Sequence, residues 1–278
     1  YSAKGCGVRA ARLFLPDMQE ALDRRLEIEG GLRAALNVDG FELHYQPQVR
    51  QGGSLAGAEA LVRWTHPKLG AVSPLEFIGI AEETGLIYQL GDWILRRACQ
   101  DLASLPAERQ LHIAVNISPR QFRADDFVDR IKTILAVTGA PASRLTLEIT
   151  ESVVIDNLDQ TVERMQALKA LGISFSVDDF GTGHSSLAYL KRLPLDVLKI
   201  DQSFVRGVCS DPNDAVIVET IIAMSRHLGL EVIAEGVETE DALTFLEGQG
   251  CRCYQGYLFA RPAPFADLRE RIETEYSE

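Results

Sequence analysis

The segment ISFSVDDFGTG, residues 173–183, is a short apolar strand that ends in two adjacent carboxylates, Asp178 and Asp179. Successive side chains of a strand point to opposite faces, so these two carboxylates diverge unless the backbone turns there. If it turns, each carboxylate could bind one of two neighbouring metal ions. Gly181 and Gly183 would allow the loop to turn sharply close to a ligand. The alternative is that the Asp-Asp pair only caps a turn.

Other short apolar strands of the chain also end in a carboxylate, a carboxamide or a lysine. Oxygen ligands together with one amine are typical of a site where Mg²⁺ or Mn²⁺ acts on a phosphate ester. A parallel α/β barrel assembles its active site from strand ends, so position and chemistry agree. These residues are Glu59 in LAGAEALVRW, Asn116 in LHIAVN, Glu148 in LTLEIT, Lys199 in DVLKI, Glu235 in EVIAE and Gln255 in CRCYQ.

Strand-like and helical segments alternate along most of the chain, with about eight strands in total. That number is expected for a (β/α)8 barrel. A doubly wound open sheet is the competing architecture, but polar residues at nearly every strand end favour the barrel. The Ser73–Pro74–Leu75–Glu76 segment has the arrangement of a capping box and predicts the start of a helix.

The segment before the first strand predicts a helix over residues 18–38. Its leucines recur at roughly helical spacing, whereas Gly30–Gly31 weakens its middle. We therefore expect a linker helix rather than a core element.

The composition indicates one large soluble domain. The chain has 278 residues, of which 46% are hydrophobic, and 28 basic against 40 acidic residues give a net charge of −12. Such a surface repels long nucleic acid, whose binding depends on Lys and Arg. No apolar run is long enough to span a bilayer and no secretory signal is visible, so we expect no membrane contact from this segment. The five scattered cysteines indicate reduced thiols in a cytoplasmic protein.

Several of these residues also have plain structural interpretations. Asn116 could cap the following helix, and Glu151 could stabilise a helix amino terminus through the dipole. Lys199 could balance charge among carboxylates or orient an attacking water. The histidines share no common position, and neither a serine-triad elbow nor a phosphate-binding loop is present.

The segment Glu59–Ala60–Leu61–Val62–Arg63 resembles the signature of EAL-domain cyclic di-GMP phosphodiesterases. The resemblance covers nearly everything from Asn37 to Phe265. It continues through VNIS (115–118), LEITES (147–152), DDFGTGHSSL (178–187), LKID (198–201), AEGVET (234–239) and QGYLFARP (255–262). It implies a modified TIM barrel with an antiparallel first strand, and hydrolysis of cyclic di-GMP to linear pGpG.

The resemblance also implies a role for each site residue. Two Mg²⁺ or Mn²⁺ ions would activate water, and Ca²⁺ is expected to inhibit. Lys199 would contact the attacking water, and Glu235 would be the general base or a further metal ligand. Glu151 would tether the loop that carries Asp179. The implied metal ligands are Glu59, Asn116, Glu148, Asp178 and Asp179; Gln46, Leu61, Arg63 and Pro262 would contact substrate, with Gln255 and Glu238 in support.

The resemblance finally implies partners and domain limits. Residues 1–17 resemble the end of a GGDEF domain, residues 18–38 would be the linker, and residues 39–278 the EAL barrel. A homodimer is expected, coupled to the site through the loop from Asp179 to Ser186. His184 in that loop departs from the family, many members of which carry tyrosine. The alternatives are a receptor that binds cyclic di-GMP at an intact but unproductive site, and an unrelated acidic-site barrel enzyme with Mg²⁺-dependent enolate chemistry.

Overall fold

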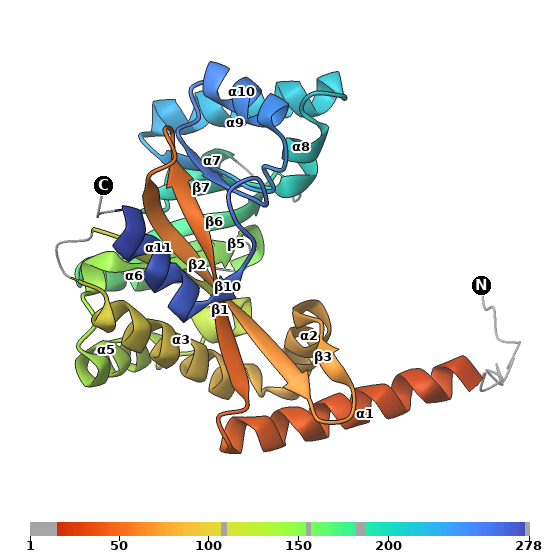
Figure 1. Ribbon diagram of the computed structural model, residues 1–278. Helices are drawn as coiled ribbons and strands as arrows, with labels where there is room; N and C mark the ends of the chain where they lie inside the picture. The colour runs from red at the N-terminus through yellow and green to blue at the C-terminus, as the bar shows by residue number, and fades with distance from the viewer. Residues whose placement is uncertain (1–15, 107–109, 154–156, 182–186, 276–278) are drawn as a thin grey trace, which may run out of the picture.

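Eight strands close into a barrel in the computed structural model, which describes residues 16–106, 110–153, 157–181 and 187–275 (Figure 1). Each strand pairs with the next in the order β1-β9-β8-β7-β6-β5-β4-β2, and β2 returns to β1. The barrel predicted from the strand ends is therefore confirmed. The strands are β1 (Phe41–Arg50), β2 (Leu55–His66), β4 (His112–Ile117), β5 (Leu145–Thr150), β6 (Ser174–Phe180), β7 (Val197–Ile200), β8 (Glu231–Ala234) and β9 (Cys253–Gln255).

The first strand runs antiparallel to both of its neighbours, whereas the other barrel pairs are parallel. A tight turn connects β1 to β2, and Gly52 and Gly53 adopt the positive φ angles of 90° and 87° that it requires. The register places Gln46 opposite Glu59 and Gln48 opposite Gln255. The reversal predicted for the first strand is confirmed, and it brings two glutamines of β1 beside residues predicted to form the site.

Helices cover the outside of the barrel, and the strands between them are buried on both faces. In β5 every residue except Thr150 is buried, as expected for parallel strands enclosed by helices. The helices are α1 (Pro16–Asn37), α2 (Pro74–Thr84), α3 (Ile87–Ser104), α4 (Pro119–Phe122), α5 (Phe127–Thr138), α6 (Leu158–Lys169), α7 (Leu187–Leu190), α8 (Gln202–Gly207), α9 (Pro212–Leu228), α10 (Glu240–Gly248) and α11 (Phe265–Glu275), with short strands β3 (Gly70–Val72) and β10 (Ala263–Pro264) and 3-10 turns at Ala142–Arg144 and Glu151–Val153.

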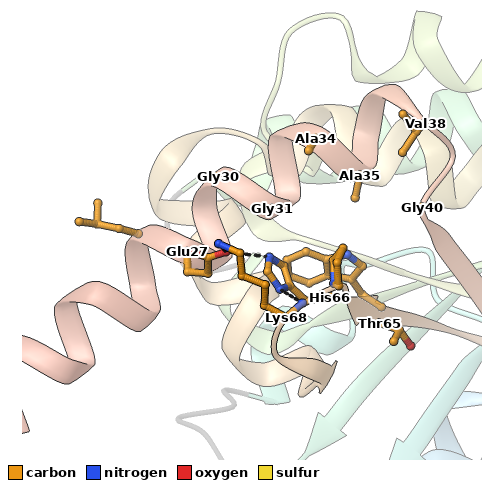
Figure 2. Close-up of a pocket in the computed structure, with 13 residues that line it drawn as sticks. Glu27, Gly30, Gly31, Ala34, Ala35, Val38, Gly40, Thr65, His66 and Lys68 are labelled. Atoms are coloured by element: carbon orange, nitrogen blue, oxygen red, sulfur yellow. Dashed lines mark hydrogen bonds and ion pairs between the residues drawn. The ribbon is translucent and has the colours of Figure 1, made fainter.

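Helix α1 projects at its amino-terminal end and packs against α2 and α3 further along its length (Figure 1). Ile28 and Leu32 are almost completely buried there. Gly31 lies directly over His66, and a Cβ atom at this position would come within 2.4 Å of the imidazole ring (Figure 2). The glycine that weakens the helix in isolation therefore allows the close approach of His66. The expectation that this helix is not a core element is wrong for its second half, because Ile28 and Leu32 belong to the hydrophobic core. The proposed limits of the linker remain a prediction.

The capping box predicted at Ser73 is wrong, although the helix start is correct. Ser73 is the N-cap residue of α2 and Pro74 follows it, but the Ser73 side chain makes no capping hydrogen bond. Glu76 instead forms two hydrogen bonds with Arg24 of α1, at 2.6 and 2.7 Å. The glutamate that would have closed the box thus binds a neighbouring helix.

Among the residues that the structure describes, no helix combines the length and the apolar character needed to cross a membrane.

Candidate active site

The backbone turns at Asp178 and Asp179, which is the condition for both carboxylates to reach one site. The ladder between β6 and β7 changes register between Val177 and Phe180, and Asp179 has a φ angle of 54°. This left-handed conformation is uncommon for a residue other than glycine. It interrupts the alternation of the strand, so that Asp178 and Asp179 both contribute an oxygen to a cluster with Glu235.

Two carboxylate clusters share Asp178 at the carboxyl ends of the strands. Glu59, Glu148 and Asp178 form one cluster, and Asp178, Asp179 and Glu235 form the other. Within each cluster, the ligand oxygens all lie within 4.8 Å of one another. Carboxylate oxygens at this spacing could hold a divalent cation. A shared carboxylate between two such clusters is suited to two neighbouring ions.

Lys199 lies at the centre of these clusters and is completely buried. Its Nζ atom lies 2.7 Å from Glu235, 2.9 Å from Glu148 and 3.3 Å from Glu59. Asp178 Oδ1 is also near, at 3.0 Å, but makes no hydrogen bond of good geometry. One oxygen of Glu148, Oε1, is buried and accepts no hydrogen bond from the described residues. A single ammonium group therefore leaves some of these carboxylate oxygens without a hydrogen bond from the described residues. Carboxylate oxygens of this kind are suitable ligands for bound cations.

Side-chain amides hold Glu59 from both sides. Asn116 Nδ2 donates to one Glu59 oxygen at 2.6 Å, and Gln255 Nε2 donates to the other at 2.6 Å. Gln255 also bonds to Gln46 and Gln48 of β1 at 3.1 and 3.0 Å. Asn116 is not a helix cap, because Ser118 caps α4 and forms a complete capping box with Gln121. Its amide oxygen is thereby available to a cation beside Glu59.

A cavity of about 260 Å³ adjoins the carboxylates, and the predicted substrate residues line it. Arg63 is half-buried there and donates to the backbone carbonyl of Val62 at 2.9 Å. Burial lowers the pKa of Arg63, although the charge of Glu59 opposes the shift. The cavity lining includes Gln46, Leu61, Arg63, Glu238, Gln255 and Pro262, all predicted from the sequence.

Residues 30–262 match the model of the EAL domain family. The chain belongs to the EAL domain family. It is 45% identical over 273 residues to the cyclic di-GMP phosphodiesterase NbdA of Pseudomonas aeruginosa, covering 97% of this chain and 35% of the relative. It is 41% identical over 271 residues to MucR of the same organism, a bifunctional diguanylate cyclase and cyclic di-GMP phosphodiesterase, covering 96% of this chain and 40% of MucR.

Solved structures agree with this EAL assignment. The PaMucR phosphodiesterase in complex with c-di-GMP superposes with a TM-score of 0.84 at 42% identity, over 87% of this chain and 99% of that one. The FimX EAL domain from Pseudomonas aeruginosa bound to c-di-GMP gives a TM-score of 0.78 at 26% identity, over 85% of this chain and 96% of that one. The chain spans about a third of the length of the curated relatives that it matches, 35% and 32% for the first two.

The titration behaviour of the EAL site follows from crowding of negative charge. Burial raises the pKa of Glu235 to about 8, and Asp178 and Glu59 add to the shift while Lys199 opposes it. Burial also raises the pKa of Glu148 well above its usual range. For Asp179, burial and the nearby Asp178 and Asp201 raise the pKa to about 7. The carboxylates would therefore share protons unless cations neutralise them.

The pKa values of Lys199 and Glu59 shift in the direction that favours the charged form of each group. Burial by itself would lower the pKa of Lys199, but the surrounding carboxylates more than offset this and raise the pKa well above its usual value. Burial would raise the pKa of Glu59, yet Lys199, Gln255 and Asn116 together lower it. Both groups are therefore charged in the folded domain near neutral pH.

Four side chains near the EAL site were missed by sequence reasoning, besides the cavity-lining Gly236 and Gly256. Asp201 caps α8 through Ser203 N at 2.9 Å, and its carboxyl lies against that of Asp179. It stands two residues after Lys199 in LKID, which was the available signal. Three further residues, Gln202, Arg206 and Tyr257, line the cavity without having been singled out. Arg206 pairs with Glu238 at 2.8 Å.

Glu151 anchors the start of the DDFGTG loop. Its Oε1 atom accepts a hydrogen bond from the backbone N–H of Gly181 at 3.0 Å. The residue lies in a 3-10 turn and not at the start of an α-helix. The predicted coupling of this loop to a dimer interface remains a prediction, and His184 lies outside the described residues.

Proposed function

We propose that this EAL domain hydrolyses cyclic di-GMP to linear pGpG in a reaction that requires two Mg²⁺ or Mn²⁺ ions. The observation that carries the proposal is the pair of carboxylate clusters joined through Asp178. The cyclic di-GMP phosphodiesterases NbdA and MucR are similar over almost the whole chain, which supports the same substrate.

The metal ligands in this proposal come from both clusters. Glu59, Glu148 and Asp178 would hold one ion together with the amide oxygen of Asn116. Asp178, Asp179 and Glu235 would hold the other. Such ions neutralise the phosphate charge, lower the pKa of a bound water and stabilise the leaving oxygen. The amide bonds to Glu59 fix its carboxylate in a single orientation, which reduces the rearrangement needed to receive a cation.

In this proposal, Lys199 orients the attacking water and does not remove a proton from it. Its raised pKa keeps the ammonium charged, and a charged ammonium has no lone pair with which to accept a proton. It can donate hydrogen bonds to the attacking water and to the carboxylates around it. Glu235 is the residue that could accept a proton, because its carboxylate lines the substrate cavity and lies 2.7 Å from Lys199, beside the position of the attacking water. Its place in the second cluster supports metal ligation equally well.

The cavity supplies the substrate contacts. Arg63 is positioned at its wall, and a planar guanidinium binds phosphate through two parallel hydrogen bonds. Leu61 and Pro262 offer apolar surface to the nucleoside, while Gln46 and Glu238 offer polar atoms. The negative charge of the domain does not oppose a small phosphodiester, since bound cations reverse the local field.

Purified protein incubated with cyclic di-GMP and Mn²⁺ tests the proposal, with pGpG detected by chromatography. Product formation that stops on addition of EDTA supports it. Binding of cyclic di-GMP without product would instead support the receptor alternative. A Glu59→Ala variant is the matched control, because it removes one ligand and leaves Arg63 in place.

We further propose that the domain functions as a homodimer, in the cytoplasm and in one chain with a GGDEF domain. The last point is supported by the bifunctional relative MucR, of which this chain covers 40%. Light scattering of the purified domain tests the dimer directly.

A further inference from the structure

A cavity of about 120 Å³ lies inside the barrel beneath the carboxylate clusters. Barrel interiors of this fold are ordinarily filled by bulky branched side chains. Here small residues occupy many of the inward positions, among them Ala56, Ala114, Ser174 and Ser176. Since a water molecule takes about 30 Å³ in the liquid, the space suits a few molecules.

The cavity extends from the site to the opposite end of the barrel. Glu148 lines its inner end, and Thr146 stands two residues earlier on the same strand. Arg50 and Glu231, both exposed, line its far end where β1 finishes and β8 begins. The cavity is therefore open to solvent at the end of the barrel opposite the substrate cavity, whereas Glu148 at its inner end is 1% exposed.

Ser176 points to a bound ligand in this cavity. The residue is 1% exposed, and its Oγ atom makes no hydrogen bond with the described part of the chain. A buried hydroxyl without a partner is unfavourable, so natural structures satisfy such groups with ordered water. Apolar cavities remain dry, but this one is lined by hydroxyl, amide and carboxylate groups.

Ser176 is also placed to act on Glu148. The two residues are paired in the ladder between β5 and β6, so they lie in the same layer of the barrel. Lys199 holds Glu148 Oε2 at 2.9 Å, whereas Oε1 has no partner among the described residues. No hydrogen bond from the described residues therefore fixes Oε1, and a water molecule bonded to it would restrain the carboxylate from its second side.

We propose that the barrel interior beneath Glu148 binds a small cluster of ordered water molecules, anchored by Ser176, which positions the Glu148 carboxylate for its metal. Ser176 is then a positioning residue that acts through water. The effect on the metal rests on the proposed function, whereas hydration of the interior does not.

Two measurements test this inference, and neither requires turnover. A high-resolution crystal structure of the metal-free protein should show water bonded to Ser176 Oγ. Titration with Mn²⁺, followed by the electron paramagnetic resonance of the free ion, should show about tenfold weaker binding in Ser176→Ala, the size of loss typical when a group supporting a metal ligand is removed. Ser176→Thr keeps the hydroxyl and should restore most of the affinity.

Ser225→Ala is the matched control. Ser225 is equally buried and its Oγ also lacks a partner among the described residues, but it lies on helix α9 outside the cavity. This variant should bind Mn²⁺ like the wild type. A dry interior in the crystal, a coordinated monovalent cation in place of water, or unchanged Mn²⁺ affinity in Ser176→Ala would each overturn the inference. Failure to hydrolyse cyclic di-GMP would contradict the proposed function and leave these results unaffected.

Discussion

Replacing Lys199 with methionine tests how much the buried ammonium stabilises the metal-free domain by compensating the charge of the carboxylates around it. The substitution keeps the length of the side chain and removes the ammonium that lies 2.7–3.3 Å from four carboxylates. Removing one partner from a buried ion pair costs about 3–5 kcal/mol, because the remaining charges stay buried without compensation. At about 2–4 °C per kcal/mol for a domain near this size, the melting temperature should fall by roughly 6–20 °C.

The loss of stability in Lys199→Met should depend on pH, and the pKa shifts of the carboxylates determine the direction of that dependence. The folded-state pKa values of Glu148 and Glu235 are raised above those of the unfolded chain. Groups of this kind favour the folded state at low pH, and this contribution is lost as pH rises through the folded pKa, about 8 for Glu235. Without Lys199 these pKa values rise further. The variant should therefore lose most stability at pH 7.5 and above and much less at pH 5, where the carboxyls bind protons.

Thermal unfolding followed by circular dichroism, in EDTA at pH 5 and pH 7.5, measures both effects. Lys132→Met is the control, since Lys132 pairs with Asp129 at the surface, with its side chain 50% exposed, and such pairs contribute little. The reasoning fails if Lys199→Met melts like this control at pH 7.5. It fails equally if the loss is the same at both pH values.

Four further predictions concern catalysis. Asp178→Ala removes the carboxylate common to both clusters, so turnover should fall by more than the roughly 10–100-fold typical of a group that only supports a ligand; wild-type rates with Mg²⁺ would contradict the metal assignment. Ca²⁺ should occupy the site yet support little hydrolysis, because it prefers longer bonds and a looser shell; equal rates with Ca²⁺ and Mg²⁺ would count against two-metal activation. Glu235→Gln should lose most activity, and near-normal Mn²⁺ affinity with partial recovery at higher pH would identify a base, whereas collapse of that affinity would identify a ligand. Glu151→Ala removes the bond to Gly181 and should impair turnover several-fold; normal turnover and metal binding in that variant would refute the coupling.

The fold and the carboxylates could be predicted from the sequence because both depend on local pattern. Each strand is a short apolar run followed by a polar residue, so the strand ends are visible in the chain. The sequence predicts a role for both carboxylates only if the backbone turns at Asp179. No sequence pattern shows that this aspartate adopts a φ angle of 54°. The conformation depends on the change in register between β6 and β7.

Residues missed by sequence reasoning depend on how separate elements approach each other. Arg206 reaches the cavity because α8 packs closely against the loop after β8, where Gly236 has room only for a hydrogen atom beside Gln202. Glu76 could not be assigned to Arg24 because that contact spans 52 residues of chain. Contacts of this kind depend on tertiary packing, which the local sequence pattern does not encode.

The reversed first strand changes where the chain meets the barrel. In a barrel of eight parallel strands, the first strand starts at the end opposite the active site. Here β1 starts at the catalytic end, so the chain passes from α1 into the barrel on the same side as the active site. Asn37 closes that helix, and Gln46, which lines the cavity beside the carboxylates, follows after nine residues. A shift of α1 along its axis would pull directly on the strand that carries Gln46, with no other element of the barrel between them.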